Sequence, residues 1–134
     1  MGTHLNFNSL FDPTIAIAQV NELLATAGAA PSPTVIAGDL NANANSILDP
    51  TNQTYQTIRN AGYDDAWSII NGSAPGLTCC QDENLSNDTT HLSVRYDMVL
   101  PRGVTVTAAR FVNSQRVLNL WPSDHAGVLV TMSQ

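Results

Sequence analysis

Apolar residues along the chain recur in two patterns, which predict helices alternating with strands. Between residues 13 and 27, the apolar residues from Ile15 to Ala27 lie at near-helical spacing, as in a helix with one buried face. Asp12 and Pro13 can begin this helix and Gly28 can end it, because Asp caps free N–H groups, Pro fits the first helical position and Gly favours the C-terminal turn.

The strand pattern is clearest in two segments. Residues 34–38 (Thr-Val-Ile-Ala-Gly) form an apolar run without alternation, as in a sheet covered by helices. Residues 104–112 begin with alternating apolar and polar residues, which predicts a strand with one wetter face. In all we expect strands at 3–7, 34–38, 93–100, 104–112 and 126–132, a short helix at 53–60, and a loop over the polar stretch 71–92.

Length and charge limit the classes of function. A chain of 134 residues is typical of one domain, and no apolar run approaches the ~18 residues of a membrane span. The net charge of −6, from five basic against eleven acidic residues, argues against a broad basic face for nucleic acid. A phosphate-rich ligand would therefore need a metal ion to offset the repulsion.

The segment Gly-Asp-Leu-Asn-Ala (residues 38–42) follows the apolar strand directly. Ligand sites in α/β sheets collect at the carboxyl ends of strands, and residues i and i+2 of an extended chain point the same way. Asp39 and Asn41 could therefore face one ligand. The alternative is a simple turn, since Gly, Asp and Asn are common turn residues.

Three further segments carry candidate polar groups. Asp124 and His125 precede the last strand, where a carboxylate could bind a hard cation and an imidazole could contact phosphate; a turn with a solvated His is the alternative. Asp97 interrupts an apolar strand, so it needs a partner, which is either an imidazole or Arg95 on the same face. His4 lies on a short strand and by itself is more often structural.

Cys79 and Cys80 are adjacent, which excludes the multi-bridge framework of small secreted scaffolds. A structural zinc site needs four ligands, and no second cysteine pair exists. Ordinary loop packing is the preferred interpretation, with a disulfide between the two neighbours as the alternative.

Taken together and in this order, Thr-His-Leu (3–5), Gly-Asp-Leu-Asn-Ala (38–42), Arg-Tyr-Asp-Met-Val-Leu (95–100) and Ser-Asp-His-Ala-Gly-Val-Leu-Val (123–130) resemble the second half of the endonuclease/exonuclease/phosphatase family. The resemblance implies an α/β fold: half of a four-layer α/β/β/α DNase I-like sandwich, with one mixed sheet and helices on one face. Residues 1–134 would then form the C-terminal half of such a domain.

The resemblance also implies hydrolysis of a phosphoester, for which a nucleic acid is one candidate, with Mg²⁺ (or Mn²⁺ or Ca²⁺) as cofactor. Asp39 and Asn41 would hold phosphate, metal or the attacking water, and Asp124 would be a metal-site carboxylate. His125 would contact the scissile phosphate, with Asp97 orienting it. His4 would bind phosphate or help protonate the leaving group. The implied catalytic set is His4, Asp39, Asn41, Asp97 and His125; the metal set is Asp39, Asn41 and Asp124; the substrate-binding set is His4, Asn41 and His125.

The family's principal metal-binding glutamate belongs to the half that would precede residue 3, and the only glutamates here, Glu22 and Glu83, lie outside the matching motifs. We therefore expect incomplete metal binding, and activity of the isolated chain that is weak or absent. The inner sheet face would also be uncovered, which predicts a homodimer or a complex with a separate first half. The alternatives are a non-catalytic assembly module and, less favoured, a Ca²⁺ loop formed by Asp82, Glu83 and Asp88. The lysine-free, Asn-rich composition is compatible with export from a bacterium.

Overall fold

The computed structural model describes residues 1–6, 14–112 and 114–134. The expected helix start at Asp12 and Pro13 and the end of the first strand at Phe7 lie outside these residues. Most predicted elements are present, with ends shifted by one or two residues. In chain order the elements are β1 (Gly2–His4), α1 (Thr14–Ala29), β2 (Thr34–Asp39), α2 (Asn52–Asn60), α3 (Ala66–Asn71), β3 (Asp97–Arg102), β4 (Thr105–Val112) and β5 (Gly127–Ser133).

Strand β2 lies at the centre of a three-stranded mixed sheet. It pairs in parallel with β1 and antiparallel with β3. Gly38 allows β1 to come this close: its φ is +146°, and a Cβ atom there would lie 1.7 Å from the carbonyl oxygen of Thr3. Gly38, the last residue of the predicted strand 34–38, is therefore needed inside the strand.

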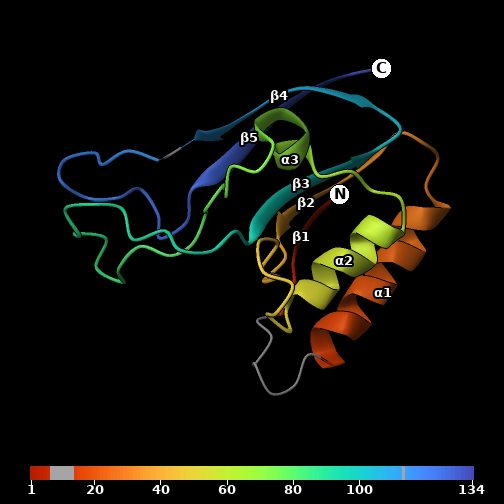
Figure 1. Ribbon diagram of the computed structural model, residues 1–134, viewed down its shortest axis with the longest axis horizontal. Helices are drawn as coiled ribbons and strands as arrows, with labels where there is room; N and C mark the ends of the chain where they lie inside the picture. Colours follow the sequence, from red (N-terminus) through yellow and green to blue (C-terminus); the bar gives the residue numbers. More distant parts are fainter. Residues whose placement is uncertain (7–13, 113) are drawn as a thin grey trace.

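Helices α1 and α2 lie side by side and cover one face of this sheet (Figure 1). The apolar stripe of α1 supplies Val20 and Leu23 to the core, where they join Ile36 of β2 and Met98 and Leu100 of β3. These side chains alternate along each strand with residues of the other face, because successive side chains of a strand point to opposite faces. The helix-covered face thus forms the buried core of the fold.

The opposite face of the sheet carries smaller apolar residues. Val35, Ala37 and Val99 occupy the alternate positions of β2 and β3 and are half-buried. The face on which a second layer was expected is therefore apolar and partly accessible to solvent.

The last two strands form a second ladder. Strands β4 and β5 pair with each other in an antiparallel, two-stranded sheet, with a register shift between Val106 and Ala108. The single mixed sheet expected from the sequence is therefore divided into a three-stranded and a two-stranded part. Helix α3 packs on β4, where the rings of Trp67 and Phe111 stack with centroids 4.4 Å apart.

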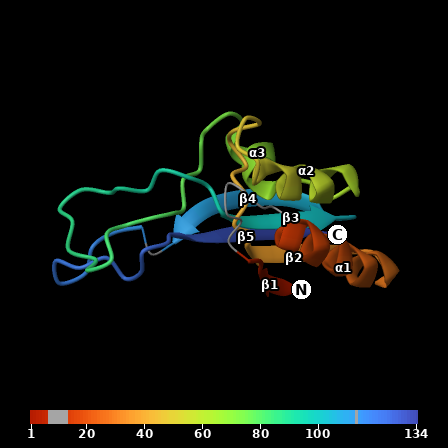
Figure 2. The same ribbon diagram turned by 90° about the horizontal axis from the view of Figure 1, so that it is seen from below.

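Two long loops extend beyond the ends of the strands, as the turned view shows (Figure 2). The backbone N–H of Trp121 in the second loop donates to the carbonyl of Leu85 in the first, and its indole N–H donates to that of Asn87. The strand predicted at 93–100 begins only at Asp97. Before that point Val94 pairs with Cys79, while the carbonyl of Tyr96 accepts from the N–H of Leu40, just after β2.

A buried ion pair ties the start of β3 to α3. Both terminal nitrogens of Arg95 donate to the Asp65 carboxylate, at 3.1 and 2.8 Å, and the two side chains are 5 % and 2 % exposed. Asp65 also caps α3 by accepting from the N–H groups of Trp67 and Ser68. The proposed partnership of Arg95 with Asp97 is therefore wrong, because the guanidinium is committed to another carboxylate in the protein interior.

The electrostatics of Asp65 fit this arrangement. Burial by itself would raise the pKa of Asp65, but the adjacent Arg95 guanidinium and the hydrogen bonds from Arg95, Tyr55 and Ser68 outweigh burial and lower it below the usual value. A carboxyl with a lowered pKa stabilises the fold above the pKa of its unfolded form, and this contribution is lost as the pH falls through the folded-state value.

No helix among the described residues is long and apolar enough to cross a membrane.

We expect Arg95→Met to lower the free energy of unfolding by about 3–5 kcal/mol, because it leaves the buried Asp65 charge without its partner. Arg116→Met is the matched control. Arg116 pairs at 2.9 Å with Asp88, whose side chain is 94 % exposed, and an exposed pair contributes about 1 kcal/mol or less. Urea denaturation of both variants measures the difference, and equal losses would contradict the assigned importance of the buried pair.

Candidate active site

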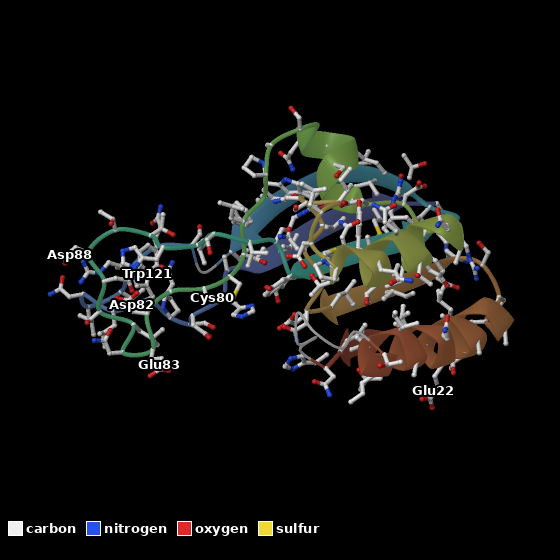
Figure 3. The ribbon with its side chains drawn as sticks, turned by 60° about the horizontal axis from the view of Figure 1, so that its bottom comes forward. Glu22, Cys80, Asp82, Glu83, Asp88 and Trp121 are labelled. Atoms are coloured by element: carbon white, nitrogen blue, oxygen red, sulfur yellow. A yellow bond between two sulfur atoms is a disulfide. The ribbon has the colours of Figure 1, made fainter. Side chains whose placement is uncertain are left out.

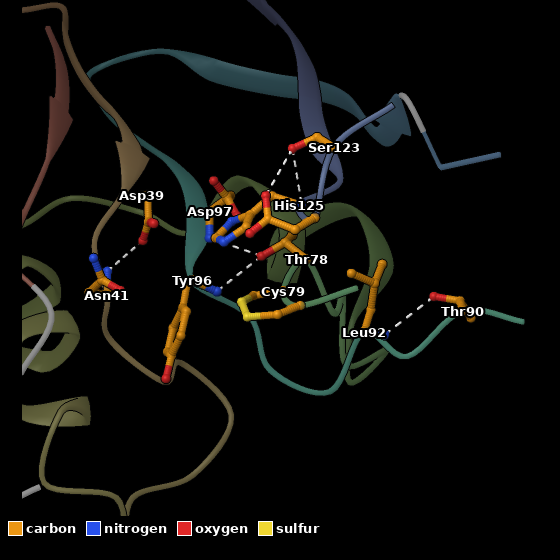
Figure 4. The surroundings of a disulfide bond; sticks show 12 residues. Asp39, Asn41, Thr78, Cys79, Thr90, Leu92, Tyr96, Asp97, Ser123 and His125 are labelled. Carbon is orange, nitrogen blue, oxygen red and sulfur yellow. Dashed lines mark hydrogen bonds and ion pairs between the residues drawn. A yellow bond between two sulfur atoms is a disulfide. The ribbon is translucent and has the colours of Figure 1, made fainter. Parts of the chain in front are cut away.

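Three of the predicted site residues form one row across the sheet. In the β1–β2 ladder His4 is the register partner of Asp39, and in the β2–β3 ladder Asp39 is the partner of Asp97. Partners directly opposite each other in neighbouring strands project from the same face and lie close together. Strand register alone thus brings together residues from three separate motifs at the carboxyl end of β2, and Figure 4 shows Asp39 and Asp97 there.

Asp39 is the central member of this row. One of its oxygens, Oδ2, lies 3.5 Å from Nε2 of His4, and the other, Oδ1, accepts a hydrogen bond of 2.8 Å from the backbone N–H of Asn41. Burial raises the pKa of Asp39 above its usual value, and the nearby Asp97 carboxylate raises it further. Together they outweigh the Asn41 hydrogen bond and the two nearby imidazoles. The group is therefore a carboxylate in a setting that favours an added positive charge.

The side chain of Asn41 is partly used by the fold. Its Nδ2 donates to the carbonyl of Leu5 at 2.8 Å, and the residue is 6 % exposed. A left-handed backbone, with φ of 47° at Asn41, turns the chain after β2. The turn and the site suggested by this segment therefore coexist, and Oδ1 of Asn41 is the side-chain atom left for a ligand.

Asp97 pairs with His125. Nδ1 of His125 lies 2.7 Å from Oδ2 of Asp97, and the two side chains are 25 % and 22 % exposed. The backbone N–H of His125 donates to Oγ of Ser123, which fixes the turn before β5. Of the two partners considered for Asp97, the imidazole is the one observed, and this bond orients the ring and leaves Nε2 for a ligand.

A segment that the sequence did not single out for chemistry connects the two halves of the site. Residues 78–81 run between β3 and the turn at Ser123–His125 (Figure 4). The buried Thr78 hydroxyl accepts from the backbone N–H groups of both Tyr96 and Asp97 at 3.0 Å, while its carbonyl accepts from Ala126. Thr78 therefore links the start of β3, which carries Asp97, to the segment before β5, which carries His125. In the sequence, only its position beside Cys79 distinguishes it.

Cys79 and Cys80 form a disulfide with each other. The ordinary loop packing preferred from the sequence is therefore wrong. Cys79 is 1 % exposed and makes isolated bridges to Val94 on one side and His125 on the other. The cysteine pair thus lies directly beside the histidine of the candidate site.

Side-chain atoms of Asp39, Asp97 and His125 lie within 4.8 Å of one another. This group could hold a divalent cation, since carboxylate oxygens are the ligands that hard cations prefer. Asp124 is outside it and is exposed, with Oδ1 3.3 Å from Oγ of Ser123. The structure places His4, Asp39, Asp97 and His125 close to one another at the end of β2.

Both glutamates and two of the loop aspartates lie away from this group. Figure 3 shows Glu22 on α1, and Asp82, Glu83 and Asp88 on the projecting loop. Asp82 pairs with His91 at 2.7 Å, and Asp88 pairs with Arg116. Among the described residues these loop acids form no metal-binding cluster, which removes the structural support for a Ca²⁺ loop.

Comparison with known proteins was made at the levels of sequence and structure. No protein-family sequence model and no curated protein matches the chain. Solved structures do match. The D. rerio TDP2 complex with single-strand DNA product matches 100 % of this chain and 55 % of its own, with a TM-score of 0.68 and 20 % identity.

Two other structures give the same picture. The Neisseria 3′ phosphatase NExo bound to product DNA hairpin matches 92 % of this chain and 54 % of its own (TM-score 0.71, 18 % identity). The endonuclease/exonuclease/phosphatase protein of Beutenbergia cavernae matches 96 % of this chain and 33 % of its own (TM-score 0.67, 22 % identity). The chain has the fold of half a DNase I-like domain. It spans about half the length, or less, of the DNase I-like chains it matches, and at these identities the likeness establishes the fold.

We expect Thr78→Val to destabilise this half-domain by about 1–3 kcal/mol, because two backbone N–H groups lose their acceptor in a buried setting. Thr78→Ser keeps the hydroxyl and is the matched control, with a smaller loss. Thermal unfolding of the two variants measures the difference. A larger loss in the serine variant would show that the methyl group, and not the hydroxyl, holds the segment.

Proposed function

We propose that the chain is the C-terminal half of a metal-dependent phosphoester hydrolase of the endonuclease/exonuclease/phosphatase family, with a phosphodiester as substrate. The observation that supports this most is the meeting of His4, Asp39, Asp97 and His125 at one end of β2, from three register partners and the turn before β5. The structural similarity to a 3′ phosphatase bound to a DNA hairpin and to TDP2 bound to single-strand DNA supports the same class of reaction.

A divalent cation suits the charges of this site. The charged groups that act on Asp39 are Asp97, His4 and His125, so two carboxylates face each other with imidazoles as the nearby bases. The chain has no lysine. Each of its arginines hydrogen-bonds elsewhere: Arg59, Arg95, Arg102, Arg110 and Arg116. Positive charge for a phosphate group must therefore come from an imidazole or from a metal ion.

Mg²⁺ or Mn²⁺ would be held by Asp39 together with the Asn41 amide oxygen, with Asp124 as the further carboxylate that the family resemblance implies. Bound there, the ion would act as a Lewis acid on a phosphoryl oxygen. Oxygen atoms suit these ions; in this structure Asp39 belongs to the group of possible metal ligands, while Asp124 lies outside it. Asp97 also faces Asp39, and we assign it to His125 because Oδ2 already accepts from that ring.

The residues of this chain divide the remaining work. Asp39 would orient a water molecule and accept its proton as the water attacks phosphorus. His125, held by Asp97, would donate from Nε2 to an equatorial phosphate oxygen, where charge builds in the transition state. His4, whose side chain is 74 % exposed, would contact phosphate or protonate the leaving oxygen.

We expect weak hydrolysis of bis-p-nitrophenyl phosphate by this chain in Mn²⁺, abolished by EDTA and lowered by about 100-fold or more in Asp39→Ala and His125→Ala. His91→Ala is the matched control: His91 forms the same 2.7 Å bond to an aspartate, but on the projecting loop, so it should keep full activity. Release of p-nitrophenolate gives the rate. Turnover no higher than that of the Asp39→Ala variant would contradict catalysis by this chain.

A second candidate function is a non-catalytic assembly module, which the uncovered sheet face favours. Val35, Ala37 and Val99 line that face, and beside Asp97 it is hollowed by a cavity of about 140 Å³ lined by Ala37, Val99 and Val128. We propose that a complementary half of the same fold or a second copy of the chain covers it, because the matched structures are roughly twice as long as this chain.

We expect the isolated chain to self-associate through this face at micromolar concentration. Val99→Arg should shift the population to monomer, because it places a charge in the centre of the apolar face. Ile15→Arg is the control, since Ile15 is 57 % exposed on α1 and should leave the mass unchanged. Multi-angle light scattering reads the mass directly, and a monomer in the unaltered protein would contradict self-association.

A further inference from the structure

We propose that Cys79, Cys80 and His125, when the disulfide is reduced, form a binding site for a thiophilic divalent cation such as Cd²⁺ or Zn²⁺. One ligand atom from each of these residues lies within 4.8 Å of the others. This site is distinct from the oxygen-rich Asp39–Asp97 pair, although the two share His125. The sequence around the two cysteines does not predict this site, because the third ligand, His125, lies in a distant part of the sequence.

The backbone fixes the relative positions of the three ligands. Cys79 makes antiparallel bridges to Val94 and to His125. Hydrogen bonds on either side of it hold the two segments together, from the N–H of Ala126 to the carbonyl of Thr78 and from that of Gln81 to the carbonyl of Asp124, each 2.8 Å long. These bonds do not involve sulfur, so opening the disulfide leaves them in place.

The ligand types select a soft cation. Thiolate sulfur and imidazole nitrogen favour zinc-like and softer ions over Mg²⁺, and three protein ligands with one open position are sufficient for a tetrahedral zinc site. A dithiol reductant supplies two electrons and two protons, opens the disulfide and becomes a cyclic disulfide itself. The cation then displaces the two thiol protons and binds both sulfurs.

His125 is already oriented as metal-binding histidines usually are. Its Nδ1 bonds to the Asp97 carboxylate at 2.7 Å, and a carboxylate on one ring nitrogen fixes the tautomer that presents the other nitrogen to a metal. The same Nε2 is the atom assigned above to phosphate. It follows, resting on the proposed function, that a soft cation here withdraws the histidine from catalysis and inhibits hydrolysis.

The site is open to reagents from one side. Cys80 is exposed while Cys79 is buried, and Cys80 lies where the projecting loop leaves the sheets (Figure 3). A reductant can therefore reach the bond through Cys80, and the ion enters the same way.

The test is titration of the whole chain with Cd²⁺, before and after reduction with a dithiol that is then removed, followed by the ultraviolet charge-transfer band of cadmium thiolate. We expect a saturable band with one Cd²⁺ per chain after reduction, and no band in the oxidised protein. Cys80→Ser should abolish the two-thiolate band. Cys79→Ser tests the same ligand pair, and it replaces Cys80→Ser if circular dichroism shows that the Cys80 variant folds poorly.

His125→Ala distinguishes the three-ligand site from a simple dithiol and should weaken Cd²⁺ binding by about 10-fold or more. Asp97→Asn should weaken Cd²⁺ binding by about 10-fold, because the carboxylate orients the His125 ring. Asp82→Asn, which alters the matching pair on the loop, should leave it unchanged. Equal Cd²⁺ affinity in the reduced protein and in His125→Ala would overturn the site. Because binding is read without hydrolysis, this result is independent of whether the chain proves to be an enzyme.

Discussion

The register of β2 against β3 is the constraint on which the site depends. It sets Asp39 opposite Asp97, and the parallel pairing with β1 adds His4 to the same row. A slip of one residue would turn every side chain of β2 to the other face, sending Asp39 towards the helices and Ile36 towards solvent. The burial of Ile36, Met98 and Leu100 under α1 and α2 therefore also fixes the polar row.

That row brings two carboxylates together, which costs free energy unless positive charge compensates. The fold places its one fully buried guanidinium at Asp65, beneath α3, and not at Asp97. At the candidate site, the partners of Asp39 and Asp97 are the imidazoles of His4 and His125. The buried guanidinium is thus kept apart from these two acids, and this gives the end of β2 its chemical character.

Much of the scaffold could be predicted from local pattern. The apolar stripe from Ile15 to Ala27 and the run at 34–38 specify α1 and β2, because helical spacing and continuous burial leave few alternatives. The ends of elements were less certain: β3 begins at Asp97, and Val94 before it pairs with Cys79. Such pairing between distant segments leaves no mark on the local sequence.

The site residues were predictable to the extent that they lie in ordered motifs, and their partners were not. Asp97 needed a partner by its burial, yet the choice of His125 over Arg95 depends on a bond between Arg95 and Asp65, which are 30 residues apart. The role of Thr78 was likewise hidden, because a hydroxyl that accepts from two backbone amides is visible only in the folded chain.

Residues 78–81 show how one short segment can serve structure and chemistry together. Thr78 fixes the start of β3, Gln81 fixes the carbonyl of Asp124, and Cys79 bridges to His125 between them. The imidazole therefore lies between two sets of ligands, oxygen atoms on the side of Asp39 and Asp97 and sulfur atoms on the side of the cysteines. The oxidation state of the two sulfur atoms decides which cation can bind the imidazole. A disulfide offers no thiolate, so in the oxidised protein the carboxylates of Asp39 and Asp97 are the charged ligands next to the ring.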